Sequence, residues 1–160
     1  MENADITVQI VLEGFKSNLK KATKLLNELS DKDLLQEIVI FKNTGHYVFG
    51  HLNAVHDNMI SLLGLGESLY PELAEVFIKN PDKADLQKPS IVQLRIQWDE
   101  INLALVEKLE SLTTAQWFAK HTAVSDEDFA KEPQRNRLSV VISRGNHLAY
   151  HVGQLVLLKN

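Results

Sequence analysis

Apolar residues in the segment 90–112 recur at intervals of three and four, and this pattern constrains the fold more than any other feature of the chain. It is the period of an α-helix with one buried face. Ser90 follows Pro89 and can cap the start of such a helix. An isolated helix cannot bury its own apolar face, so this one must pack against other elements. The face comprises Ile91, Leu94, Trp98, Ile101, Leu105, Leu109 and Leu112.

Three more segments have the same helical period. The first is 5–29 and the last is about 138–158, which is apolar over much of its circumference. The remaining one starts at Asn43 or Thr44, either of which can cap it, and ends near Gly64, a suitable left-handed C-terminal residue. Its core stripe is Val48, His51 with Leu52, Val55, Met59 and Leu62. The chain is therefore predicted to be all-α, with four main helices in one domain, 1–160.

Two long connections separate these helices. A turn at 30–33 follows the first helix, whereas 65–89 and 113–137 are much longer, and a short helix is expected around 71–79. A connection of this length can cross a bundle from end to end, so the second and third helices can run parallel. Long loops often carry function, which makes both connections candidate lids.

Composition excludes several classes of function. The 160 residues contain no cysteine, so a metal ion would need nitrogen or oxygen ligands. The formal net charge is −4. The only cluster of basic residues lies in a helix that also carries glutamates, and it consists of Lys16, Lys20, Lys21 and Lys24. This arrangement is typical of a solvated face, and no nucleic-acid partner is expected.

No membrane span is expected either. The most apolar stretch, 138–158, is interrupted by an arginine, an asparagine and two histidines, which would be costly in hydrocarbon. The beginning of the chain is polar and acidic, unlike a signal peptide. We expect a cytoplasmic protein.

Three histidines are candidate metal ligands. His147 and His151 lie about 40° apart on one helical face and about 6 Å apart along the axis. His51 lies on the core stripe of the second helix. His46 and His56 are rotated about 140° from it and are expected on the outer, solvated face.

The alternative is that His51, His147 and His151 are core residues satisfied by ordinary hydrogen bonds. Against it, each neutral imidazole has one acceptor nitrogen that needs a partner, and three in one core are hard to satisfy without a cation. His121, in the last connection, is expected to be solvated, with a fourth ligand as the alternative.

The residues around these histidines resemble a known family. The last helix reads His147-Leu-Ala-Tyr-His151-Val-Gly-Gln-Leu, similar to the H-x3-H-x-G-Q motif of the DinB/YfiT-like superfamily, and Gly50-His51-Leu52 resembles its first histidine motif. The resemblance implies a four-helix bundle of up-down-down-up topology with a long crossover between helices two and three, a homodimer, and a divalent metal held by the three histidines. Members include transferases that use low-molecular-weight thiols, metal-dependent hydrolases and proteins without known activity.

Three histidines would leave positions open for water or substrate, as in catalytic sites. Zinc is the first expectation and nickel, iron or manganese the alternatives, because imidazole suits several divalent ions. Leu148 stands where an H-E-x-x-H protease has its glutamate, so peptide hydrolysis is disfavoured. The sequence identifies no catalytic acid or base.

Five residues one turn from the ligands are candidates for supporting the site or binding substrate: Thr44, Tyr47, Ser143, Arg144 and Gln154. Tyr47 could position substrate, and Arg144 could bind the carboxylate of a thiol cofactor. Tyr47 as a core residue and Arg144 as a surface or interface cation are the alternatives. Trp98 and Trp117 are expected to be packing residues.

Three functions therefore remain open. The leading hypothesis is a metal-dependent transferase that joins a small thiol to a small-molecule substrate; the others are a metal-dependent hydrolase and a non-catalytic metal-binding stress or interaction protein. The last helix is more apolar than one core stripe requires, so it is either the most buried helix of the bundle or part of a dimer interface. The residues in question are Val141, Ile142, Val152, Val156 and Leu157.

Overall fold

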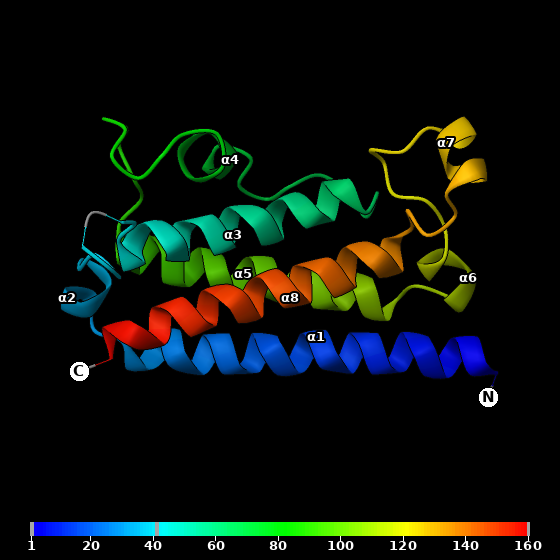
Figure 1. Ribbon diagram of the computed structural model, residues 1–160, viewed down its shortest axis with the longest axis horizontal. Helices are drawn as coiled ribbons and strands as arrows, with labels where there is room; N and C mark the ends of the chain where they lie inside the picture. The colour runs from blue at the N-terminus through cyan, green and yellow to red at the C-terminus, as the bar shows by residue number, and fades with distance from the viewer. Residues whose placement is uncertain (1, 41, 160) are drawn as a thin grey trace.

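A computed structural model describes residues 2–40 and 42–159, and all regular elements in these ranges are helices, with two isolated bridges beside them. The predicted all-helical class is confirmed. Four helices are long and the others are short (Figure 1). Their bounds are α1 Asn3–Glu28, α2 Asp31–Leu34, α3 Gly45–Leu62, α4 Leu73–Phe77, α5 Ile91–Glu110, α6 Thr114–Trp117, α7 Asp126–Lys131 and α8 Arg137–Leu155, followed by the 3-10 turn η1 Val156–Leu158.

The predicted helix ends are confirmed where a side chain caps them. The Thr44 hydroxyl accepts the N–H of Tyr47 at the start of α3, and the Ser90 hydroxyl accepts that of Gln93 at the start of α5. Gly64, just after α3, has a φ of 67°, the left-handed conformation expected of it. The helical period and the caps therefore locate these elements closely.

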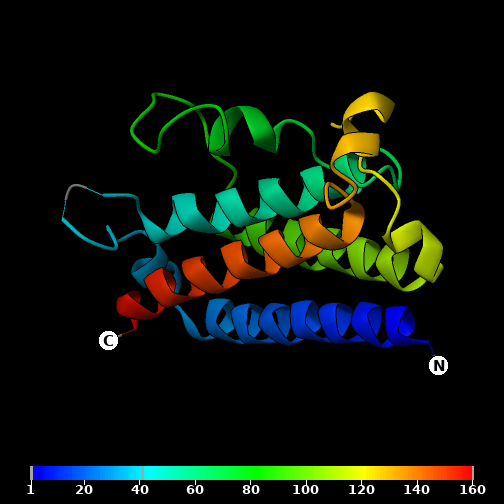
Figure 2. The same ribbon diagram turned by 45° about the vertical axis from the view of Figure 1, so that its right-hand side comes forward.

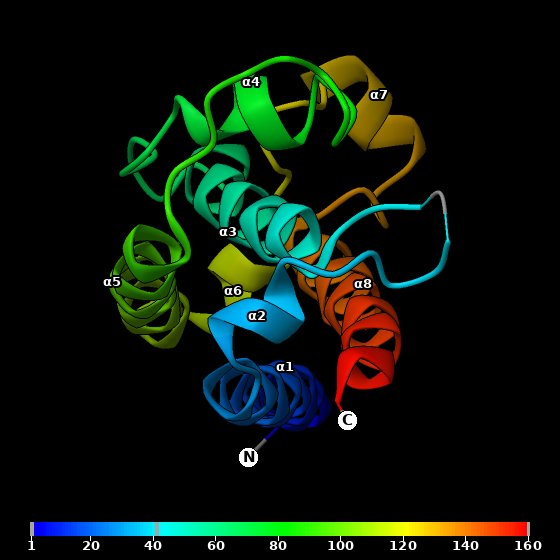
Figure 3. The same ribbon diagram turned by 90° about the vertical axis from the view of Figure 1, so that its left-hand side faces the viewer.

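The four long helices surround a common core (Figure 3). α1 and α8 run in one direction, and α3 and α5 run in the other (Figure 1). Two contacts fix these directions: Lys159, after α8, pairs with Glu28 at the end of α1, and His46 donates to the Pro89 carbonyl where α3 and α5 both begin. The parallel neighbours α3 and α5 need the long connection predicted between them.

The connections contain more helix than predicted. α4 lies within the expected 71–79 segment, but α2, α6 and α7 fall in stretches predicted to be turns or loops. The side chains of Ser30, Thr113 and Ser125 each accept the backbone N–H of the residue three positions later and so cap these helices. The connection 65–89 runs over α3 (Figure 2). The connection 113–137 is held at the C-terminal end of α3 by a hydrogen bond of 2.9 Å from the Thr122 N–H to the Leu62 carbonyl.

The most buried helix is α3, not α8. Thirteen of its eighteen residues are buried, because α4 and the crossover cover the face that the bundle leaves open. By contrast, Ile142 on α8 is 45% exposed, and Val156 and Leu157 in η1 are 47% and 65% exposed. Val141 is fully buried, so burial in the bundle accounts for part of the extra apolar residues, although α8 is not the most buried helix.

The prediction that His56 is solvated is wrong. Its side chain is fully buried, its Nδ1 lies 2.6 Å from the Asn102 side-chain oxygen, and its ring stacks on Trp98 at 5.2 Å. His46, also expected on the outer face, is half-buried. The rotation of 140° from His51 was correct, but that direction faces α5 and the core because α3 has neighbours on nearly every side.

No helix in the described ranges is long and apolar enough to cross a bilayer.

Burial lowers the pKa of His56 to about 4, against the opposing effect of its hydrogen bond to Asn102. The unfolded chain takes up this proton first, near pH 6.5, so His56 reduces stability progressively as the pH falls from about 6.5 to about 4. We expect metal-free wild type to lose about 2 kcal/mol more unfolding free energy than His56→Gln between pH 7 and pH 5. Urea unfolding at the two pH values measures this, and equal losses would show that His56 is not held neutral.

Candidate metal centre

Three histidines from two antiparallel helices meet in one cluster. His147 and His151 lie one turn apart on α8, and His51 faces them from α3. The Nε2 atom of His147 lies 3.1 Å from the Nε2 of His51 and 3.1 Å from the Nε2 of His151. One ligand atom from each ring lies within 4.8 Å of the other two, and all three side chains are half-buried. The structure therefore brings together the three residues selected from the sequence.

Two of the rings have their tautomers set by the protein. The Nδ1 of His51 lies 2.8 Å from the Phe77 carbonyl, which can only accept, so Nδ1 carries the proton. The Nδ1 of His151 donates in the same way to the Gln154 side-chain oxygen at 2.7 Å. In both rings the Nε2 atom is then unprotonated, and its lone pair faces the cluster. This is the arrangement by which proteins orient histidine ligands of metals.

The donor set fits a divalent ion. Tetrahedral zinc with Zn–N bonds of 2.0 to 2.1 Å places its nitrogens about 3.3 Å apart, close to the 3.1 Å seen between two pairs here. Without a cation, His147 can share one proton with one neighbour only, because the other two Nε2 atoms are already acceptors. The two remaining lone pairs would then repel each other. The His147 Nδ1 is buried without a hydrogen-bond partner among the described residues, with or without an ion on Nε2.

Burial keeps all three imidazoles neutral at physiological pH. It lowers the pKa of His51 and of His151, although the hydrogen bonds to Phe77 and Gln154 oppose it. The pKa of His147 falls to about 4, mainly through burial and then through the neighbouring His151 and His51. Because a histidine must be neutral to bind a metal, protons compete weakly with an ion at this site.

A glycine makes the contact between His51 and Phe77 possible. A Cβ built on Gly50 would lie 2.2 Å from the Phe77 ring, so only glycine lets α4 approach α3 this closely. That approach brings the Phe77 carbonyl beside the next residue, His51. The sequence analysis missed Phe77 because it acts through its backbone. A glycine inside a helix next to a candidate ligand was the available signal.

The two polar residues predicted just before His147 have different surroundings. Arg144 is half-buried, and its positive charge contributes to the lowered pKa of His51 and of His147. It makes no ion pair with a carboxylate of the described chain, so its guanidinium can donate hydrogen bonds to an anionic ligand beside the cluster. Ser143 is exposed and makes no hydrogen bond to the three imidazoles.

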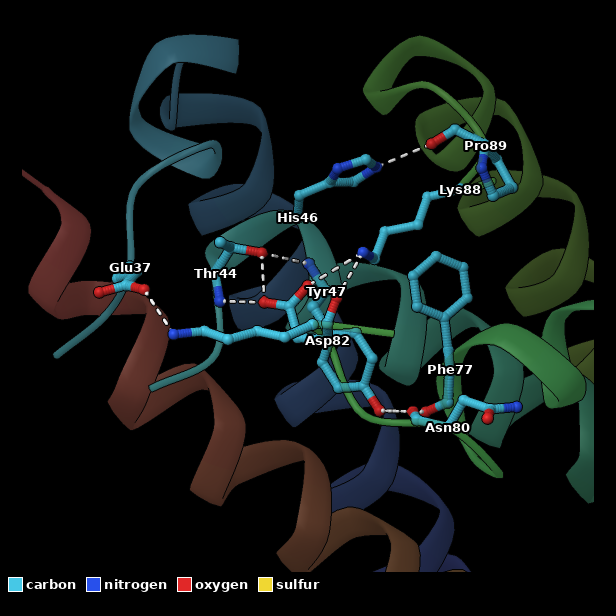
Figure 4. Close-up of polar contacts among 10 residues, drawn as sticks. Glu37, Thr44, His46, Tyr47, Phe77, Asn80, Asp82, Lys88 and Pro89 are labelled. Atoms are coloured by element: carbon cyan, nitrogen blue, oxygen red, sulfur yellow. Dashed lines mark hydrogen bonds and ion pairs between the residues drawn. The ribbon is translucent and has the colours of Figure 1, made fainter. Parts of the chain in front are cut away.

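The three other predicted neighbours all have hydrogen-bond partners within the protein. Gln154 contacts His151 directly and donates to the Tyr150 hydroxyl at 3.1 Å. Tyr47 was a candidate for positioning substrate, with a core residue as the alternative. It is buried, and its hydroxyl donates at 2.6 Å to the Asn80 carbonyl, which agrees with the alternative. Thr44 caps α3 and bonds Asp82, so it does not reach the histidines (Figure 4). Thr44 and Tyr47 both lie where the crossover covers α3. The Thr44 hydroxyl donates to an acidic side chain of the crossover, and the Tyr47 hydroxyl donates to its backbone.

The remaining candidates lie away from the cluster. His121 is half-buried in the second connection and is not part of the three-histidine group; its Nδ1 has no hydrogen-bond partner among the described residues. Trp98 and Trp117 are both buried, as packing residues should be, and the Trp98 indole donates to the Thr23 hydroxyl at 2.9 Å.

Neither a protein-family model nor a curated protein matches this chain.

Replacing any one ligand should remove the metal. For His51→Ala, His147→Ala and His151→Ala we expect metal content to fall from one equivalent to near zero, together with the stabilisation that metal gives, about 2.7 kcal/mol at a hundredfold excess over Kd. The checks are elemental analysis and thermal unfolding of protein purified without a histidine tag. His121→Ala is the control and should bind like wild type. His56→Ala is unsuitable because it would empty the core. Full metal content in all three variants would contradict the site.

Proposed function

We propose that this protein binds one divalent metal ion through His51, His147 and His151 and transfers a low-molecular-weight thiol to a small electrophile. The observation that carries the proposal is the convergence of three Nε2 atoms, that of His147 lying 3.1 Å from each of the other two, with two of the rings oriented by hydrogen bonds at Nδ1. Three protein ligands leave at least one position of a tetrahedral ion for a small molecule, as in catalytic sites.

The helix arrangement supports the DinB/YfiT-like assignment. The directions of the long helices follow the order up, down, down, up, and the long crossover joins α3 to α5 (Figure 1). Gly50 has a physical role beside His51, which fits its place in the first histidine motif. Zinc is the ion we propose first, and nickel, iron or manganese would suit the same imidazoles.

The charges around the cluster favour a thiol over water as the nucleophile. A divalent ion would act there as a Lewis acid that promotes deprotonation of a coordinated thiol or water. Arg144 adds positive charge, and no carboxylate is among the groups that shift the pKa of the three histidines. Hydrolysis usually recruits a general base, whereas a thiolate attacks without further proton removal.

In the proposed reaction the thiol sulfur forms a bond to an electrophilic carbon while the carbon–halogen bond breaks. The halide leaves, and the thiol proton passes to solvent. Arg144 would hold a carboxylate of the thiol and so direct its sulfur toward the cluster. Metal binding without turnover is one alternative, because no carboxylate of the described residues contributes to the pKa shifts of the histidines. Metal-dependent hydrolysis is the other.

We also propose a homodimer. Ile142 on α8 and Val156 and Leu157 in η1 are exposed apolar residues, and Ile10 on the neighbouring α1 is 67% exposed. A two-fold interface would cover these residues. Sedimentation at micromolar concentration should give twice the chain mass of 18.1 kDa. Ile142→Asp should convert the dimer to a folded monomer, and a monomeric wild type would contradict the proposal.

Turnover should require a thiol and should be best with a carboxylate-bearing one. We would incubate metal-loaded protein with an alkyl halide and several cellular thiols, with His151→Ala as the background. The expected product is the thioether. Arg144→Gln should raise the KM for a carboxylate-bearing thiol about tenfold or more and leave a neutral thiol unaffected, since a charge-assisted hydrogen bond contributes roughly 1.5 to 3 kcal/mol.

Other results would select another function. Thiol-independent hydrolysis of an ester or amide that disappears in His151→Ala would support the hydrolase. Full metal binding with no turnover under any condition would support the non-catalytic protein.

A further inference from the structure

The crossover between α4 and α5 is fastened to the start of α3 by a buried carboxylate (Figure 4). Asp82 is 8% exposed, and its Oδ2 accepts from the Thr44 backbone N–H at 2.7 Å and from the Thr44 hydroxyl at 2.9 Å. Its Oδ1 lies 3.2 Å from the Lys88 ammonium, which also donates to the Asp82 carbonyl at 2.6 Å. Every polar group of this clasp has a partner, so the clasp itself is not a binding site.

Tyr47 joins this clasp to the histidine cluster. Its hydroxyl donates to the Asn80 carbonyl at 2.6 Å and lies 3.3 Å from the Phe77 carbonyl (Figure 4). Its ring is nearly parallel to that of His51, with an interplanar angle of 10° and centroids 6.5 Å apart. Tyr47 therefore restrains both the imidazole and the backbone that the imidazole binds.

The Phe77 carbonyl is the shared element. It accepts from the His51 Nδ1, and the Tyr47 hydroxyl lies within hydrogen-bond distance on the other side. If Phe77 and the residues after it moved away from α3, His51 would lose the carbonyl that fixes its tautomer and orientation. Hydrogen bonds of this kind change metal affinity by about 10- to 100-fold when they are removed.

We propose that Tyr47 is a positioning residue that links metal binding at His51 to closure of the crossover segment 77–88 over α3. The inference rests on the proposed metal site. A cation on Nε2 makes the Nδ1–H of His51 a stronger donor, which tightens its bond to the Phe77 carbonyl. Linkage requires the reverse as well, so fastening of segment 77–88 strengthens metal binding.

The test uses Tyr47→Phe, which removes the hydroxyl and keeps the ring against His51. Tyr70→Phe is the matched control, because the Tyr70 hydroxyl ties the same connection to Glu100 on α5. Zinc affinity is measured by competition with a chelating indicator. Amide hydrogen exchange of residues 78–88 is followed with and without zinc. We expect zinc to slow exchange in wild type, and Tyr47→Phe to raise Kd about tenfold and lose most of that protection. Tyr70→Phe should match wild type in both.

A purely structural role for Tyr47 gives a different result. It would lower the unfolding midpoint of the metal-free protein and leave Kd and zinc-dependent protection at wild-type values, which would overturn the inference. Lys88→Met removes the ammonium that pairs with Asp82, which weakens the clasp without altering α3, so it should also raise Kd. This variant decides the question if Tyr47→Phe does not fold. Failure of wild type to bind zinc would instead overturn the proposed function, and this inference with it.

Discussion

The histidine cluster depends on the hydrogen bond from His51 to the Phe77 carbonyl. This bond fixes which nitrogen of His51 carries a proton and therefore which one faces His147 and His151. It also requires α4 to lie on α3 at Gly50, where no side chain larger than hydrogen fits. The long crossover is thus part of the histidine cluster as well as a link between α3 and α5.

α3 has two roles that explain its unusual burial. It supplies one ligand to the cluster, and its polar residues hold the crossover at both ends. At one end Asp57 accepts the N–H groups of Leu69 and Tyr70 at 2.7 and 2.9 Å; at the other, Thr44 and Tyr47 hold the segment that ends at α5. A polar group buried in this way costs little when it is paired, and it specifies a single path for the chain. These pairs hold the two ends of the crossover, and the buried Leu73 and Phe77 side chains of α4 pack it into the core.

Burial and positive charge act together at the cluster. Burial keeps the three imidazoles neutral, so they present lone pairs to a cation, while Arg144 supplies a charge that an anionic ligand can use. The same neighbourhood contributes no carboxylate to the pKa shifts of the histidines. These features favour a nucleophile that is already an anion when bound over one that must lose a proton to a protein base.

Local patterns in the sequence determined the four long helices, the N-terminal caps of α3 and α5 and the pair His147–His151, because helical period and capping depend only on residues a few positions apart. They also placed His51 on the core stripe of α3. Only the tertiary structure decided that His56 is buried, that the hydroxyls of Thr44 and Tyr47 serve the crossover, and that Phe77 supports His51. Each depends on which segments meet across the bundle. The sequence gives the angle at which a side chain leaves its own helix. The residue that it then contacts comes from a distant part of the chain and is known only from the tertiary structure.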